Sequence, residues 1–337
     1  MTRTGITLAV IVKDEADWLK DLLFHHAPLY EAAVVVDTGS ADTSIQTARQ
    51  AGAQVLSFPW RDDFAAARNH GLAAVRTPWV LVLDCDERID PRDFPALRGL
   101  AAGPPQCHLL PQWNYLPTDD PLAWEPVPKD YASMAGTAAG FVPVWSIRLF
   151  PALPTLRYKG QVHESLVWED LGDPDPIRTD IPVHHYGHLP EYSRGKVRNE
   201  LYFSLLQEKV KTCPEDSRAW VELGAQLLER QRWALAGRVL ETVVARFPEA
   251  ADIHRGRLLL GRLRERAGDP AGAREQFDLA LRARPDLRPC WVEATRAAIG
   301  QGDRERATSL VKQGRNLFPL DPGLKSLEAK VSKGLCR

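Results

Sequence analysis

The segment Ile6-Thr-Leu-Ala-Val-Ile-Val-Lys-Asp-Glu15 is an apolar, β-branched run that ends in three charged residues. Similar apolar runs follow at Val34–Val36, Gln54–Phe58 and Trp79–Leu83. Helical patterns separate them, over residues 16–26, 42–50 and 64–75. Strands that alternate with helices at this spacing form a parallel sheet that helices cover on both faces. The first part of the chain therefore predicts an α/β fold.

Acidic side chains follow each of the four predicted strands. They are Asp14 and Glu15, then Asp37, then Asp62 and Asp63, and finally Asp84 and Asp86. The carboxyl ends of parallel strands meet at one edge of a sheet, and ligands of such sheets bind beyond that edge. The pattern predicts a site for a cation or for a polyhydroxylated ligand.

Residues 103–130 are too rich in proline for a regular helix, and they predict a long irregular excursion that can cover the site. Its aromatic residues either stack on sugar faces or form a small core of the excursion. These residues are Trp113, Tyr115 and Trp124. Short strands are expected beyond it, over residues 146–150, 166–168 and 181–185, and a helix over 191–211.

The last third of the chain repeats itself. Prolines recur at Pro214, Pro248, Pro285 and Pro319, and small residues recur at Ala236, Ala273 and Ala307. A period of about 34 residues is typical of helix–turn–helix tetratricopeptide repeats. Stacked repeats bury a core that no single repeat could bury. We therefore predict two domains, an α/β domain over 1–205 and an all-α repeat domain over 206–337.

The charges differ between these two parts. The 337 residues carry 43 Lys and Arg against 44 Asp and Glu, with 18 against 26 in residues 1–205 and 25 against 18 in the remainder. The basic residues of the second part alternate with acidic ones, so no nucleic-acid partner is expected. No apolar run approaches the about 20 residues of a membrane helix, and no signal peptide is visible. We expect a cytoplasmic protein without a transmembrane segment.

Four ordered blocks carry a family resemblance. They are Val10-Ile-Val-Lys-Asp-Glu15, Val36-Asp-Thr-Gly-Ser-Ala-Asp42, Phe58-Pro-Trp-Arg-Asp-Asp-Phe-Ala-Ala-Ala-Arg-Asn69 and Val82-Leu-Asp-Cys-Asp-Glu87. Together they resemble a family 2 glycosyltransferase of the GT-A (Rossmann-like, mostly parallel) fold, in the branch with C-terminal tetratricopeptide repeats. The resemblance implies a metal-dependent, inverting transfer of a sugar from a nucleotide-diphosphate sugar.

The resemblance places Asp84-Cys-Asp86 at the D-x-D position. It implies that Asp86, with Asp84, holds a divalent cation, Mn²⁺ or Mg²⁺, that stabilises the departing diphosphate. His185 matches a late histidine that completes the metal shell in similar enzymes, and an imidazole suits manganese better than magnesium. The alternative for this histidine cluster is a surface turn.

The resemblance also implies residues for the nucleotide sugar. Asp14 and Glu15 lie at the nucleotide edge, Asp37 matches an acidic residue that contacts the nucleoside, and Asp84 lies near the ribose. Asp37 can equally cap a strand-to-helix turn. Arg68 either reaches a diphosphate oxygen or forms an ion pair with Asp63, which is assigned to the same site.

An inverting transfer needs a general base that takes the proton of the acceptor hydroxyl. The resemblance points to Gly160-Gln-Val-His-Glu-Ser165, after a strand that contains Arg148-Leu-Phe150. Glu164 is the expected base. His163 either serves instead or orients Glu164, and the alternative for both is a hydrogen-bonded structural pair.

Other classes of function fit the sequence less well. No G-x-G-x-x-G follows the first strand and no G-x-x-x-x-G-K-[ST] occurs, which disfavours a dehydrogenase, a kinase or an NTPase. A nucleotidyltransferase would place a basic, glycine-rich loop where Lys13 to Glu15 stand. The remaining alternative is a non-catalytic scaffold or sugar-nucleotide-binding protein whose repeats bind a protein partner. For an enzyme, the acceptor would be a glycan, a peptide or a protein.

Overall fold

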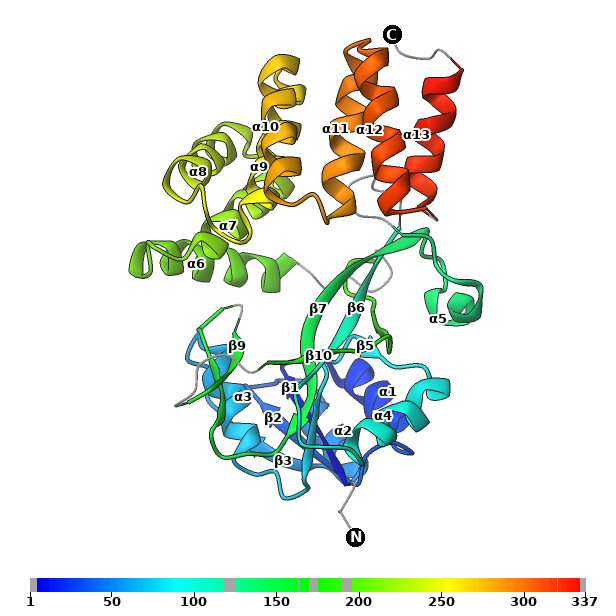
Figure 1. The fold of residues 1–337 in the computed structure, drawn as a ribbon. Helices are drawn as coiled ribbons and strands as arrows, with labels where there is room; N and C mark the ends of the chain where they lie inside the picture. The colour runs from blue at the N-terminus through cyan, green and yellow to red at the C-terminus, as the bar shows by residue number, and fades with distance from the viewer. Residues whose placement is uncertain are drawn as a thin grey trace. The chain divides into compact units, whose positions relative to one another are not determined.

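The computed structural model describes residues 5–117, 125–162, 164–169, 175–189, 196–319 and 321–333. The chain forms two compact units, one within residues 1–195 and one that contains residues 196–337 (Figure 1). Each unit has its own buried core. Within the described ranges, no helix is both long and apolar enough to cross a bilayer.

The first unit is built on the predicted parallel strands. In the order β3-β2-β1-β4, these are Gln54–Ser57, Ala32–Asp37, Ile6–Val12 and Trp79–Val82. Three helices lie between them in the sequence, α1 (Ala16–His26), α2 (Ser44–Gln50) and α3 (Phe64–Leu72). The α/β prediction is confirmed, with boundaries within about three residues of those expected.

Helices and a hairpin cover the two faces of this sheet. Apolar side chains of α1, α2 and α4 (Phe94–Ala101) pack on one face, in a core that includes Leu8, Leu22 and Leu97. The other face packs on α3 and on the hairpin β8 (Leu156–Lys159) and β9 (Ser165–Trp168). Glu164 precedes β9, so this hairpin carries the expected base.

A mixed extension continues the sheet beyond β4, in the order β7-β6-β11-β5. The strands are β7 (Gly140–Pro151), β6 (His108–Leu116), β11 (Val183–His185) and β5 (Glu87–Arg88), and β10 (Ile177–Arg178) also pairs with β6. The described part of the sheet is therefore mixed: β7 pairs antiparallel with β4 and β6, β5 pairs antiparallel with β11, and β6 pairs in parallel with β10 and β11. The remaining short elements are η1 (Pro91–Asp93), η2 (Lys129–Tyr131) and α5 (Ala132–Ala135).

The prediction of an irregular excursion is wrong for residues 108–116, which form β6. Pro111 is tolerated in this strand because of its position. On one edge of β6, β10 pairs with His108 and Leu109, and β11 pairs only from Gln112 onward. Pro111 lies in the gap between these two partners, where a missing N–H costs no hydrogen bond with them.

The aromatic residues of this region form a core. Tyr115 is fully buried, and the ring of Trp113 stacks on Phe141 with centroids 4.1 Å apart. Tyr115 also shares a hydrogen bond with His184. Of the two alternatives, the structure shows the small core for Trp113 and Tyr115, while Trp124 lies outside the described residues.

The second unit is all helical. Helix α6 (Lys196–Thr212) precedes three helical pairs and a last helix. The pairs are α7 (Ser217–Glu229) with α8 (Trp233–Arg246), α9 (Ile253–Arg266) with α10 (Pro270–Ala283), and α11 (Arg288–Gly300) with α12 (Arg304–Leu317), and α13 (Pro322–Ser332) follows. The predicted repeat domain is confirmed (Figure 1).

Equivalent residues perform the same task in different repeats. The three predicted small residues, Ala236, Ala273 and Ala307, are completely buried. The indoles of Trp220 and Trp291 each donate to the carbonyl of the proline six residues earlier, at 3.0 and 2.8 Å. Small residues at the helix contacts thus let paired helices approach closely, as the period predicted.

Candidate functional site

The carboxylate of Asp14 connects the loops that follow the first two strands. Its Oδ1 accepts hydrogen bonds from the backbone N–H groups of Ala41 (2.6 Å) and Asp42 (3.3 Å), and its own N–H donates to Ser40 Oγ. Asp14 has a positive φ of 54°, a conformation in which a short polar side chain can bond locally. The side chain therefore organises the loops at the carboxyl edge of the sheet.

Asp37 has a structural role that the sequence left as an alternative. The residue is buried, and its carboxylate accepts from the N–H groups of Gly39 (3.1 Å) and Ser40 (3.2 Å). Asp63 caps α3, since its Oδ1 accepts from Ala66 N–H at 2.9 Å. Both residues lie at the predicted edge, and both carboxylates shape the backbone there.

Glu15 lies beside the D-x-D segment. Its N–H donates to Ser44 Oγ at 3.1 Å, and its carboxylate faces the thiol of Cys85. Burial, with the neighbouring negative charge of Glu15, raises the pKa of this thiol well above its usual value. Cys85 is therefore an inert thiol, and it packs under the end of β4.

Arg68 joins two of the predicted site residues. Its Nη2 donates to Asp84 Oδ1 at 3.0 Å and its Nε donates to Glu164 Oε1 at 2.6 Å. The guanidinium is 11% exposed, and its Cζ lies 5.6 Å from the centre of the Tyr158 ring. Burial lowers the pKa of Arg68, but the two carboxylates outweigh it and raise that pKa.

The alternative ion pair between Arg68 and Asp63 is wrong. The carboxylate of Asp63 caps the first turn of α3, while Arg68 emerges one turn later and pairs with Asp84 and Glu164. Glu164 itself is 13% exposed. His163, the other candidate base, lies outside the described residues.

A buried ion pair, Glu87 with Arg148, holds the backbone of Asp84. Neither residue had a predicted role. Glu87 Oε2 accepts from the N–H of Asp84 at 2.8 Å, and Glu87 Oε1 accepts from Arg148 Nη2 at 2.5 Å. Burial raises the pKa of Glu87, and Arg148 opposes that rise. Both residues stood in quoted segments, but only the fold brings the side chain of Arg148 to Glu87.

Asp86 and His185 come together as predicted for two ligands of one ion. Asp86 Oδ2 lies 3.3 Å from His185 Nε2, and Asn114 Oδ1 accepts from His185 Nδ1 at 2.7 Å. Asn114 in turn donates to Val142 O, which fixes its amide oxygen toward the imidazole. Burial lowers the pKa of His185, but Asp86 outweighs it and raises that pKa. No pattern in the sequence pointed to Asn114.

Two of the three residues expected to bind a divalent cation, Asp86 and His185, lie close together. A Cβ placed on Gly187 would lie 2.5 Å from Asp86 Oδ2 and 3.0 Å from His185 Nε2, so the glycine keeps the space beside both donors open. Asp84 instead faces Arg68. Among the described residues, no group of three or more His, Cys, Asp or Glu side chains is arranged around one point. Asp86 and His185 are therefore the pair that can hold an ion, leaving positions for diphosphate oxygens and water.

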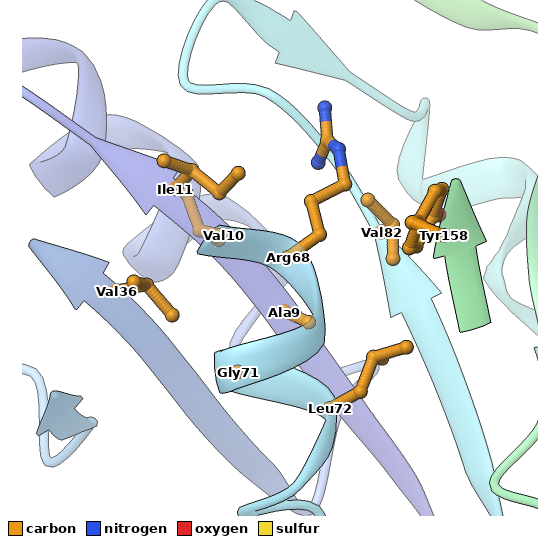
Figure 2. Close-up of a pocket in the computed structure, with 9 residues that line it drawn as sticks. All are labelled: Ala9, Val10, Ile11, Val36, Arg68, Gly71, Leu72, Val82 and Tyr158. Atoms are coloured by element: carbon orange, nitrogen blue, oxygen red, sulfur yellow. The ribbon is translucent and has the colours of Figure 1, made fainter. Parts of the chain in front are cut away.

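Figure 2 shows a cavity between α3 and the sheet, lined mostly by apolar side chains, with the guanidinium of Arg68 directed away from them. The cavity holds about 10 Å³, which is room for a single water molecule. It is too small for a nucleotide. A ligand of nucleotide size would have to bind outside it.

Comparison with known proteins agrees with the two units. Residues 9–125 match the model of the family described as Glycosyl transferase family 2. A TPR repeat-containing protein of Synechococcus elongatus is 28% identical over 299 residues, which are 82% of this chain and 66% of that protein. The chain thus spans less than two thirds of the length of this relative.

Similar solved structures include MamA from Desulfovibrio magneticus, at 22% identity and a TM-score of 0.33, over 37% of this chain and 70% of that one. Another is PilF of Pseudomonas aeruginosa, at 16% identity and a TM-score of 0.37, over 41% and 61%. Residues 9–125 are thus similar to family 2 glycosyltransferases, and the helices of the second unit have the period of tetratricopeptide repeats.

Proposed function

We propose that the first unit is a metal-dependent, inverting glycosyltransferase that uses a nucleotide-diphosphate sugar. The observation that carries this proposal is the arrangement around Arg68, in which one guanidinium lies between Asp84 at the end of β4 and Glu164 before β9. The side chain of Arg68 therefore bridges the carboxylate expected on the donor side, Asp84, and the carboxylate expected to act as the base, Glu164. The family match over residues 9–125 supports the same chemistry.

The donor side of the proposed site is the edge formed by Asp14, Glu15, Asp37 and the D-x-D segment. Asp86 and His185 would hold Mn²⁺ or Mg²⁺, which when bound would act as a Lewis acid toward the departing diphosphate. Hydroxyl groups of the ribose would donate to carboxylate oxygens at this edge. The hydrogen bonds of Asp14 and Asp37 to backbone N–H groups keep that edge preorganised.

The acceptor side is Glu164. The oxygen of the acceptor hydroxyl would attack the anomeric carbon as the bond from that carbon to the diphosphate oxygen breaks, and Glu164 would take the hydroxyl proton. The diphosphate leaves with the bonding electrons. Displacement from the opposite face inverts the anomeric centre. The adjacent guanidinium of Arg68 holds one oxygen of Glu164 through a charge-assisted hydrogen bond of 2.6 Å.

The repeats would bind a partner. Concave faces of stacked helical pairs suit extended ligands, so a protein, a peptide or a growing glycan would be presented to the first unit. The named relative is described by its TPR repeats, which favours a role in binding. The second candidate function is therefore a scaffold whose first unit binds a sugar nucleotide without turning it over.

Thermal unfolding with and without ligands tests the proposal. The purified chain is melted with UDP, GDP, ADP, CDP or dTDP, each alone and with Mn²⁺ or Mg²⁺, because a ligand that binds only the folded state raises Tm. We expect a metal-dependent rise for one nucleotide, and its loss in Asp86→Asn. The exposed Asp130→Asn is the matched control. If no nucleotide changes Tm in a folded sample, the proposed donor site is wrong.

A further inference from the structure

The guanidinium of Arg68 is shared between two carboxylates from distant parts of the first unit. Nε donates to Glu164, which precedes β9, and Nη2 donates to Asp84, which follows β4. Both bonds join charged groups, and such bonds are shorter and stronger than neutral ones. A planar guanidinium presents its donors in fixed directions, so the position of one carboxylate constrains the other.

The surroundings hold Arg68 in this position. Asn69, the next residue of α3, donates from Nδ2 to Tyr158 O at 2.9 Å, and its Oδ1 accepts from Tyr158 N–H at 2.8 Å. This pair of bonds fixes α3 against β8. The guanidinium lies over the Tyr158 ring and is mostly buried. To reach a donor diphosphate, Arg68 would have to break two ion pairs in a partly desolvated site.

The oxygens of Glu164 are therefore not equivalent. Arg68 occupies Oε1, and within the part of the chain that the structure describes, no hydrogen bond is made to Oε2. With Oε1 fixed, the plane and direction of the carboxylate are set, and Oε2 is the oxygen left to receive a proton. The same guanidinium anchors this group to the end of β4, where the donor would bind.

We infer that Arg68 is a positioning residue for Glu164 and that it does not bind the donor diphosphate. The inference rests on the proposed function of Glu164 as the base. Arg68 holds Oε1 so that Oε2 faces the acceptor hydroxyl, and it connects the base to the donor edge through Asp84. This role differs from the diphosphate contact that the family resemblance implied for Arg68.

The Arg68→Lys variant separates the two roles. An ammonium is one point charge and cannot keep both carboxylates in the bridging geometry. The assay uses the sugar donor of whichever nucleotide raises Tm, for example UDP-glucose if UDP does so. The rate of nucleoside diphosphate release should fall at least 10-fold at saturating donor. The Kd of the nucleoside diphosphate with Mn²⁺, from calorimetry, should change less than threefold.

Arg76→Lys is the matched control. Arg76 is exposed just beyond α3, and its Nη1 donates to the carbonyls of Ala73 and Val75. This variant should leave both the rate and the Kd unchanged. If Arg68→Lys instead weakens nucleotide binding 10-fold and leaves the saturated rate near that of the wild type, Arg68 binds the diphosphate and the inference is overturned. An unchanged rate overturns it as well.

A double-mutant cycle with Glu164→Gln gives the second test. If Arg68 acts through Glu164, Arg68→Met lowers the rate at least 10-fold in the wild type but less than threefold in the Glu164→Gln background. Equal effects in both backgrounds contradict the inference. Should Arg68→Met fail to fold, the cycle is made with Arg68→Lys. A wild-type chain that neither binds nucleotide nor releases it overturns the proposed function itself, which is a separate result.

Discussion

Asp86 Oδ2 lies 3.3 Å from His185 Nε2, although one residue follows β4 and the other ends β11. The antiparallel pairing of β11 with β5 produces this contact, because it sets His185 opposite Glu87 and lets Tyr186 N–H donate to Asp86 O. Two of the three residues expected at a metal thus meet through β11, a strand in the second half of the chain.

Gly187→Ala should weaken cation binding while the fold is retained. The new Cβ would lie 2.5 Å from Asp86 Oδ2, so the carboxylate and the imidazole must move apart. We expect the Kd for Mn²⁺, measured by calorimetry with the nucleoside diphosphate present, to rise at least 10-fold. Gly99→Ala, where nothing lies within 4 Å of the new Cβ, is the control. Equal affinities in the two variants would mean that Asp86 and His185 do not bind the cation.

Arg148→Met should destabilise the first unit strongly. It would leave the carboxylate of Glu87 buried without its cation, and breaking a buried pair in this way costs about 3–5 kcal/mol. Adding Glu87→Gln should recover part of the loss, since a neutral amide can still accept from Asp84 N–H. Urea unfolding of the wild type, the single variant and the double variant gives the free energies. A double variant less stable than Arg148→Met would contradict this account.

His26 should make the chain less stable at acidic pH. Its Nδ1 pairs with Leu22 O at 2.8 Å, its Nε2 accepts from Ile89 N–H at 3.1 Å, and burial lowers its pKa to about 3. The folded state therefore favours neutral His26, and its contribution is lost as the pH falls below the usual histidine pKa of about 6.5.

The size of this effect follows from one proton. Between about pH 6 and 4, the free energy of unfolding of the wild type should fall by up to about 1.4 kcal/mol per pH unit more steeply than that of His26→Gln. Urea unfolding at several pH values measures both slopes. Parallel slopes would mean that folding does not lower the pKa of His26.

Gly261→Ala should destabilise the repeats. Its Cβ would lie 2.4 Å from the ring of Phe277, between the two helices of the second pair, and overpacking of this kind costs about 1–3 kcal/mol. Gly237→Ala is the matched control, because its Cβ would make an ordinary 3.4 Å contact with Leu263. Thermal unfolding compares the two variants. A lower Tm in Gly237→Ala than in Gly261→Ala would contradict the packing.

The parallel half of the sheet and the repeats could be predicted because their signals are local. An apolar run such as Ile6–Val12 indicates the strand that it forms. In the same way, the regular spacing of the buried residues Ala236, Ala273 and Ala307 indicates the helices that contain them. Strand β6 could not be predicted, because Pro111 is acceptable only in a gap between two partners that lie about 70 residues further along.

Residues of the candidate site could be named from the sequence, but most of the contacts between them could not. The family resemblance assigned Asp84, Asp86, Glu164 and His185 to one site, but the ion pairs of Arg68 depend on how α3 meets the β8–β9 hairpin. The contact between Asn114 and His185 depends on the pairing of β6 with β11, and the contact between Glu87 and Arg148 on how β7 lies in the mixed sheet. Long-range contacts of this kind leave no pattern in the neighbouring sequence.

The most direct test of the central claim is the rate at which the purified chain releases nucleoside diphosphate from a nucleotide sugar, compared between the wild type and Glu164→Gln. We predict metal-dependent release by the wild type. Glu164→Gln should release the nucleoside diphosphate at least about 100-fold more slowly, which is typical for loss of a general base. Its nucleotide affinity should be unchanged. Equal rates in the two proteins, or no release from any nucleotide sugar in a folded sample, would contradict the account.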